Sequence, residues 1–326
     1  MCNPNMVDAA TGGPIAACTA TSRQVTLSPY GTDDEIGMLN AVTADSRTAI
    51  MARANWSRVY DLSVDNFVGM PGFTAAGDQT YQIWMTHSPG GTVVDNAPNA
   101  DVEQNELVAY SGDAISMYTH TGTHIDALNH FGYYGKIFNG FTAREHLGSR
   151  NWTKGGVDRH PPIVARGLVL DVAALHGVRT LPESYGVIAE DLQGCLQRQN
   201  LSLAYGDVVL VRTGQMALWP RKAYADNGPG VNLDGARFLA QAGVALVGAD
   251  NLSFEQIPSM VPEGEPANWN AVHCYLLGEA GVPIMENVVL DELATDGIDE
   301  FAFVAAPIRL RGATGAPVRP IAVPLS

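Results

Sequence analysis

Three histidines and an aspartate lie within one short segment of the chain, residues 120–130. They are His120, His124, Asp126 and His130. Imidazole nitrogens and carboxylate oxygens are the donors that zinc, manganese and iron accept in proteins. Alternate side chains of an extended strand share a face, so the first three are expected to point the same way, with Gly122 leaving room for an ion. Because only eight histidines are spread over the chain, this local density predicts a metal site.

The elements that must position these donors alternate between strand and helix. Apolar runs without polar alternation predict strands buried on both faces at residues 168–172, 207–212 and 244–248. Apolar residues at helical spacing predict helices at residues 189–196 and 232–240. This alternation is typical of an α/β domain.

The composition predicts a well-packed globular protein. The chain has 326 residues, of which 46% are hydrophobic and 16% charged, and a chain of this length can bury a large core. The sequence has no internal repeat and no clear linker. We therefore expect a loosely held N-terminal arm over residues 1–30, followed by one domain over residues 31–326.

Charge and cysteine usage narrow the partners and the location. The net charge is −15, which repels phosphate backbones and argues against nucleic-acid binding. No apolar run approaches the roughly 20 residues of a membrane span, and the N-terminus does not have the pattern of a signal peptide. Four widely spaced cysteines without a CxxC motif indicate reduced thiols. The four cysteines are Cys2, Cys18, Cys195 and Cys274. We expect a cytoplasmic protein with a small-molecule substrate.

The pattern HxGTHxD, followed four residues later by histidine, resembles the signature of the cyclase family of metal-dependent hydrolases. This family includes bacterial kynurenine formamidases and isatin hydrolases. Other segments add to the resemblance, which is to the longer bacterial members and covers most of the chain after about residue 30. They are residues 31–37, 166–172, 273–278 and 284–287.

The resemblance implies a fold and a metal site. The expected fold is a single α/β domain with a mixed β-sheet flanked by helices, of the swivelling β/α/β kind. The expected cofactor is a divalent metal, manganese or zinc. The ligands carried over are His120, His124 and Asp126 for one ion; in two-metal members Asp126 bridges to a second ion held by His273 and Glu286. The resemblance also implies a homodimer or homotetramer.

The activity implied is hydrolysis of a small cyclic or aryl amide, imide or lactone by metal-activated water. A bound divalent ion lowers the pKa of water toward about 7. The resemblance assigns His130 as the catalytic histidine, which takes a proton from the water and passes it to the leaving nitrogen or oxygen.

Several residues near these motifs are candidates for substrate contact. Phe131 and Tyr133 either stack on a planar ring or pack within the protein, and Trp219 has the same two roles open to it. Arg212 ends a strand, where it either binds a substrate carboxylate or pairs with a structural acid.

The residues leave two other classes of function open. His124, Asp126 and His273 imitate the facial triad of a non-haem Fe(II) oxygenase, although such enzymes are mostly all-β and a triad leaves His120 and His130 unexplained. A non-catalytic metal or small-molecule binding protein is the second alternative. Oxygen consumption with a 2-oxo acid would favour the first, and a metal-loaded protein without hydrolytic activity the second.

Overall fold

The computed structural model describes residues 23–74, 76–96, 98, 100–261 and 267–326. Most of the expected N-terminal arm, with Cys2 and Cys18, lies outside the described residues. The described part of it is held against the domain, because the Thr26 backbone donates to the Gly278 carbonyl at 3.2 Å and accepts from Asn139 at 2.9 Å.

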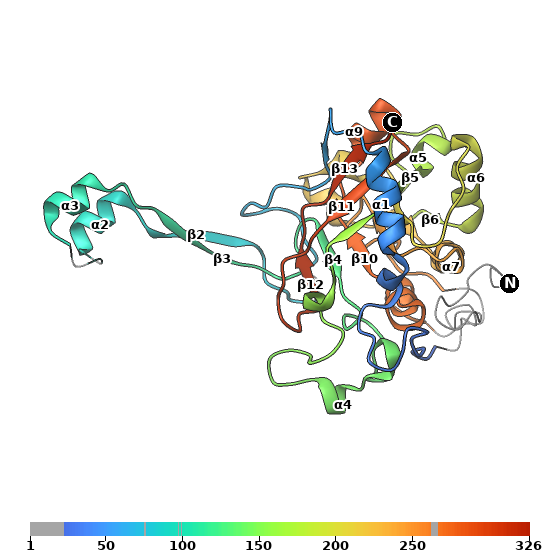
Figure 1. Cartoon of the computed structure of the whole chain (residues 1–326), viewed down its shortest axis with the longest axis horizontal. Coiled ribbons are helices and arrows are strands. Elements are labelled where there is room, and N and C mark those ends of the chain that lie inside the picture. Colours follow the sequence, from blue (N-terminus) through green and yellow to red (C-terminus); the bar gives the residue numbers. More distant parts are fainter. Residues whose placement is uncertain (1–22, 75, 97, 99, 262–266) are drawn as a thin grey trace.

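A mixed sheet forms the centre of the domain (Figure 1). Nine strands of the described chain pair in the order β1-β13-β11-β5-β7-β9-β10-β4-β12. The pairs β5–β7, β7–β9 and β9–β10 are parallel, and the pairs toward both edges are antiparallel. Their bounds are β1 (Tyr60–Asp61), β4 (His124–Asp126), β5 (Ile163–Asp171), β7 (Val208–Arg212), β9 (Leu246–Ala249), β10 (Ile284–Glu286), β11 (Glu300–Ala305), β12 (Gly315–Pro317) and β13 (Ile321–Pro324).

The three predicted buried strands overlap β5, β7 and β9, each extending one or two residues beyond an end of the observed strand, and the two predicted helices are confirmed as α6 and α7. The remaining elements are short. Apart from two helices of a projecting hairpin described below, the helices are α1 (Ala44–Arg53), α4 (Ala143–His146), α5 (Val172–Leu175), α6 (Ala189–Gln199), α7 (Leu233–Gln241), α8 (Ala271–His273) and α9 (Asp291–Asp296), with the π-helical turn η7 (Cys274–Ala280). The 3₁₀ turns are η2 (Gly37–Ala41), η3 (Phe138–Gly140), η4 (Val157–Arg159), η5 (Gln215–Leu218) and η6 (Lys222–Ala225); β6 (Gly186–Val187) and β8 (Gly230–Val231) form a separate parallel pair.

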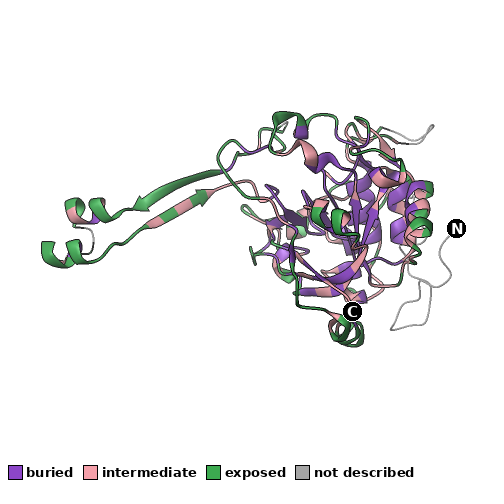
Figure 2. Ribbon diagram, turned by 90° about the horizontal axis from the view of Figure 1, so that it is seen from above, coloured by how far each residue is buried: buried purple, intermediate pink, exposed green. Residues whose placement is uncertain are grey.

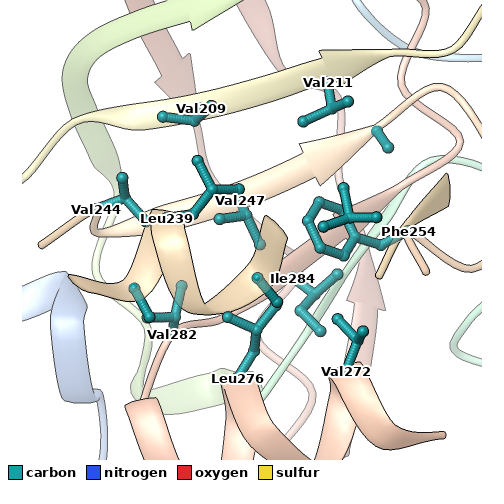
Figure 3. Close-up of a cluster of buried hydrophobic side chains, with 14 of the residues drawn as sticks. Val209, Val211, Leu239, Val244, Val247, Phe254, Val272, Leu276, Val282 and Ile284 are labelled. Atoms are coloured by element: carbon teal, nitrogen blue, oxygen red, sulfur yellow. The ribbon is translucent and has the colours of Figure 1, made fainter. Parts of the chain in front are cut away.

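The core lies on both faces of the sheet. On one face, side chains of β7 and β9 pack against α7 and η7, as Val209, Val247, Leu239 and Leu276 show in Figure 3. On the other face of the curled sheet, side chains from several strands pack against one another in a second buried cluster. Met285 of β10 belongs to this cluster. The structure thus confirms the expected α/β domain with a mixed sheet and flanking helices. No helix among the described residues is long and apolar enough to cross a membrane.

A long hairpin projects from this domain (Figures 1 and 2). Strands β2 (Gln82–His87) and β3 (Gly112–Ser116) pair antiparallel and carry helices α2 (Pro89–Asp95) and α3 (Val102–Leu107) at their far end. All six residues of β2 are exposed. No pattern in the sequence predicted this projection. We call the segment from β2 to β3 the arm; it is distinct from the N-terminal arm expected over residues 1–30.

Candidate metal centre

Two neighbouring strands place the first donors on one face of the sheet. Strand β4 pairs antiparallel with β10, and the register sets His124 opposite Glu286 and Asp126 opposite Ile284. Opposed residues of an antiparallel pair share a face, as do residues two positions apart in one strand. His124, Asp126 and Glu286 therefore point to the same side of the sheet.

His120 reaches the cluster from a turn. Only His124–Asp126 forms a strand, and residues 119–123 turn before it, which corrects the expected extended segment over residues 120–126. Gly122 has a φ of +61°, and a Cβ at this position would lie 2.2 Å from Asn66 Oδ1. This glycine therefore serves the turn. His120 Nδ1 still lies 2.6 Å from Asp126 Oδ1.

His273 completes the cluster from the end of α8. Its Nε2 atom lies 3.0 Å from Glu286 Oε1 and 3.6 Å from Asp126 Oδ2. The structure thus brings together all five residues that the resemblance suggested as ligands. Within each group of three the donor atoms lie within 4.8 Å of one another; the groups are His120, His124 and Asp126, and Asp126, His273 and Glu286.

The donor set fits a divalent metal ion. All five side chains are buried. His124 Nε2 and Asp126 Oδ2 are buried and form no well-aligned hydrogen bond among the described residues, although His124 Nε2 lies 3.1 Å from Glu286 Oε2; such atoms cost free energy. Mixed imidazole and carboxylate donors suit zinc, and they suit manganese as well. A cation between the two groups would satisfy both orphaned atoms.

The carboxylates favour positive charge in this cluster. Burial by itself would lower the pKa of His124, but the adjacent Asp126 and Glu286 carboxylates raise it to about 10. Burial likewise opposes the charged form of His273, and the carboxylates of Glu255 and Glu286 outweigh it and raise the pKa of that imidazole. The pKa of Asp126 is lowered despite its burial, because His120 and His130 lie close to it. These shifts describe a site built to hold cationic charge.

His130 lies beside the donors and faces open space. Its ring stacks on that of His120, with centroids 3.9 Å apart and planes at 22°. The surrounding protein and the His120 ring lower the pKa of His130 well below its ordinary value. The imidazole is therefore neutral at neutral pH and free to accept a proton.

A cavity of about 720 Å³ opens above these residues. His120, His130, His273 and Glu286 are among the residues that line it. Its walls include aromatic and apolar side chains, namely Phe73, Tyr118, Phe131, Ile257, Met260 and Trp269. A mostly apolar cavity with a few convergent polar groups is the usual form of a small-molecule site.

The four candidates for substrate contact separate in the structure. Phe131 lines the cavity, and its ring centroid lies 4.5 Å from that of His130 and 5.6 Å from that of Trp269. The other three, Tyr133, Arg212 and Trp219, are not among the residues that line it.

Each of these three residues has a different neighbour. Arg212 forms ion pairs with Asp171 at 3.1 Å and Asp291 at 2.7 Å. Trp219 packs edge-on against Tyr224, with ring centroids 5.1 Å apart. The backbone of Tyr133 pairs with Lys136. The ion pairs of Arg212 and the ring contact of Trp219 are of the structural kind that the sequence left open, and the role of the Tyr133 side chain stays a prediction.

Two further residues contact the donors and were not predicted from the sequence. Glu255 contacts the far ring nitrogen of His273 at 2.7 Å, and Tyr118 lies against His120 with ring centroids 4.8 Å apart. Neither residue belongs to a local motif with the donors. Tyr118 lies two residues before His120 in the chain, whereas Glu255 reaches the cluster only through the packing of a distant segment.

A known protein family matches this chain. The family model described as "Putative cyclase" matches residues 44–256, more than half of the chain. The chain belongs to this family. The match includes β4, whereas His273 and Glu286 lie beyond its end.

This cyclase-family chain is similar to one enzyme by sequence and to two solved structures. A kynurenine formamidase of Bacillus cereus is 28% identical over 211 residues, which cover 65% of this chain and 79% of that protein. The crystal structure of a novel cyclase is 28% identical, with a TM-score of 0.78 and coverage of 92% of this chain and 99% of that one. Isatin hydrolase A from Labrenzia aggregata shares the fold, with 19% identity, a TM-score of 0.59 and coverage of 82% and 94%.

Proposed function

We propose that this protein is a metal-dependent hydrolase that opens a small cyclic or aryl amide, imide or lactone. The observation that carries the proposal is the pair of donor groups sharing Asp126, of which His120, His273 and Glu286 line a largely apolar cavity. His120, His124 and Asp126 would hold one manganese or zinc ion. His273 and Glu286 would hold a second, with Asp126 between the two.

When bound, a divalent ion lowers the pKa of water and polarises a carbonyl oxygen. The chain's own contribution to proton transfer is His130. A neutral imidazole nitrogen of His130 accepts a proton from the attacking water as the new C–O bond forms. The same nitrogen then gives this proton to the leaving nitrogen or oxygen as the scissile bond breaks. One water molecule is consumed, and the products are one carboxylic acid and one amine (from an amide), one amide (from an imide) or one alcohol (from a lactone).

The aromatic side chains that line the cavity favour a planar substrate. Phe131, Trp269 and Tyr118 present ring surfaces beside the donor cluster, and aromatic pairs prefer edge-on or offset contact with another ring. The relative from Bacillus cereus is a kynurenine formamidase. Of the candidate substrates, we therefore favour an N-formyl aryl amide.

Two features favour a hydrolase over a non-haem Fe(II) oxygenase. The domain is a mixed sheet with flanking helices, and oxygenases that use a facial triad are mostly built on all-β double-sheet folds. The cluster also offers five donors where a triad needs three. A non-catalytic binding protein would not need His130 beside the donors and exposed to the cavity.

The test combines metal removal with a panel of substrates. The panel contains an N-formyl aryl amide, isatin, a cyclic imide and an unsaturated lactone, each assayed with manganese or zinc. We expect turnover of at least one substrate, its loss on chelation and its return on adding one metal. Hydrolysis that persists in chelator and in a His124→Ala variant would overturn the proposal. Oxygen uptake with a 2-oxo acid would favour the oxygenase instead.

We also propose that the arm binds a second copy of the chain, as in a homodimer or homotetramer. A two-stranded hairpin is at best marginally stable alone in water. The arm nevertheless exposes Ile83, Trp84, Met85 and Ile115, each 46% or more accessible. Burying these side chains against a partner would stabilise both the hairpin and the assembly.

Charge supports the choice of partner. Residues 82–116 hold five acidic residues and no lysine or arginine. Elsewhere on the domain Arg309 and Arg311 are exposed beside a cavity of about 400 Å³, and neither forms an ion pair within the described part of the chain. An acidic arm and an arginine-bearing surface on the same chain are complementary between two copies.

The buried free thiols of Cys195 and Cys274 support our proposal of a reducing, cytoplasmic location.

A further inference from the structure

A buried carboxylate contacts the imidazole of His273 on the side of the ring away from Asp126 and Glu286. Glu255 Oε1 lies 2.7 Å from His273 Nδ1, and both side chains are almost fully buried. An ionised carboxylate can only accept, so the hydrogen lies on Nδ1. The opposite nitrogen, Nε2, faces Glu286 and Asp126.

The second oxygen of Glu255 fixes the backbone that carries this histidine. Oε2 accepts from the Val272 backbone N–H at 3.0 Å and from the Ser259 hydroxyl at 2.9 Å. Ser259 Oγ in turn accepts from the Ala271 backbone N–H at 3.1 Å. Helix α8 has no side-chain cap from its own N-cap residue, so these contacts bind the N–H groups at its start. One carboxylate thus sets both the ring and the main chain of His273.

All three histidines of the donor groups have one ring nitrogen bound away from the cluster. His124 Nδ1 lies 2.8 Å from the Gly122 carbonyl, and His120 Nε2 lies 2.9 Å from the Thr314 hydroxyl. His273 alone among them is held by a charged acceptor. A carboxylate behind a ligating imidazole fixes the tautomer, orients the ring and makes it a stronger donor.

We propose that Glu255 is a positioning residue for the second metal ion, the one assigned to Asp126, His273 and Glu286. This rests on the proposed metal-dependent function and adds a residue outside the donor set. Glu255 keeps a proton on His273 Nδ1, so that Nε2, on the side of Asp126 and Glu286, is the nitrogen that would give up its proton to a metal ion. The first donor group, His120, His124 and Asp126, does not depend on Glu255.

A matched control exists elsewhere in the fold. Asp250 is also a fully buried carboxylate that fixes a loop, accepting from the Thr213 backbone at 2.7 Å and the Gly214 backbone at 2.8 Å. No hydrogen bond or ion pair of the described chain joins its carboxylate to the five donors. An Asp250→Asn substitution therefore perturbs a buried carboxylate without changing the support of a ligand.

The test measures metal binding directly. Metal-free wild type, Glu255→Gln, Glu255→Leu and Asp250→Asn proteins are titrated with Zn²⁺ against a chromophoric chelator, and stoichiometry is checked by equilibrium dialysis. We expect two ions in the wild type. In Glu255→Gln the first ion should bind as in the wild type and the second about 10- to 100-fold more weakly. Glu255→Leu should weaken the second ion at least as much, and Asp250→Asn should leave both affinities unchanged.

A purely structural role for Glu255 predicts a different outcome. Thermal stability would fall in Glu255→Gln while both metal affinities stayed at wild-type values, and that result overturns the inference. The conservative Gln variant keeps the volume of the side chain, so it decides the question even if Glu255→Leu does not fold. A wild type that binds no Zn²⁺ contradicts the proposed function itself. A wild type that binds one ion, unaffected by Glu255→Gln, contradicts only the inference.

Discussion

His124 on β4 and Glu286 on β10 are direct partners across two antiparallel strands, and His124 Nε2 lies 3.1 Å from Glu286 Oε2. These residues come from opposite halves of the chain. Their pairing depends on the register of one pair of short strands near the edge of the sheet. A slip of one residue would turn Glu286 to the opposite face and dismantle the cluster. The metal centre is therefore a property of strand pairing as much as of the local motif.

Replacing the shared ligand should have a larger effect than replacing an outer one. Asp126 belongs to both donor groups, whereas Glu286 belongs to one. We expect Asp126→Asn to bind neither ion tightly and to hydrolyse no faster than the chelated wild type. Glu286→Gln should retain one ion. Metal analysis after dialysis measures this, and equal metal loss in the two variants would contradict the bridging role.

Replacing the catalytic histidine should separate chemistry from metal binding. His130→Ala removes the proton carrier but none of the five donors, so metal content should stay at the wild-type level while kcat falls by about 10²–10⁴. Tyr133→Phe is the control, because Tyr133 does not line the cavity. Steady-state kinetics on the best substrate of the panel measure both variants. Full activity in His130→Ala would remove this residue from the mechanism.

Acid should destabilise the fold through His160. This histidine is buried, both ring nitrogens are without hydrogen-bond partners among the described residues, and burial lowers its pKa to about 4. Between pH 6.5 and 4 the unfolded chain binds a proton here that the folded chain does not. The stability present above pH 6.5 is therefore lost as the pH falls, by roughly 3 kcal/mol at this site.

Urea unfolding of metal-free protein from pH 7.5 to 4.5 tests this expectation. His160→Leu should flatten the decline in unfolding free energy, and His87→Leu, at an exposed position on the arm, should not. Parallel pH profiles for wild type and His160→Leu would show that other groups cause the acid sensitivity.

Arg212 should matter for stability and not for substrate binding. Its guanidinium joins Asp171 and Asp291, and removing it leaves the partly buried Asp171 carboxylate without its cation. We expect Arg212→Met to lower the unfolding free energy by roughly 1–3 kcal/mol with KM unchanged. Thermal unfolding and kinetics measure the two quantities. A rise in KM without loss of stability would return Arg212 to the substrate site.

The arm should control assembly. Ile83 and Met85 share a face of β2, and burying an apolar side chain contributes about 1.5–3 kcal/mol. Replacing both by serine should weaken self-association by about a hundredfold or more. The control variant on the same strand is Gln82→Ser with Thr86→Ser. Sedimentation velocity over a concentration series measures the effect, and a wild type that is monomeric throughout would rule out the second copy as the arm's partner.

Local patterns predicted the parts of the protein that depend on local geometry. Unbroken Val and Leu runs identified the segments that became β5, β7 and β9, because a strand covered on both faces has no polar side to alternate. The HxD spacing placed His124 and Asp126 on one face, because side chains alternate along any strand. The density of ligand types in the motif predicted the chemistry of the site before its shape was known.

Tertiary structure decided what depends on which segments become neighbours. The turn at Gly122, and not strand alternation, brings His120 to Asp126. The pairing of β4 with β10 selects Glu286, and the docking of α8 brings in His273 with Glu255 behind it. Such contacts arise from packing of the whole core, whose pairings are not encoded in any short run of residues.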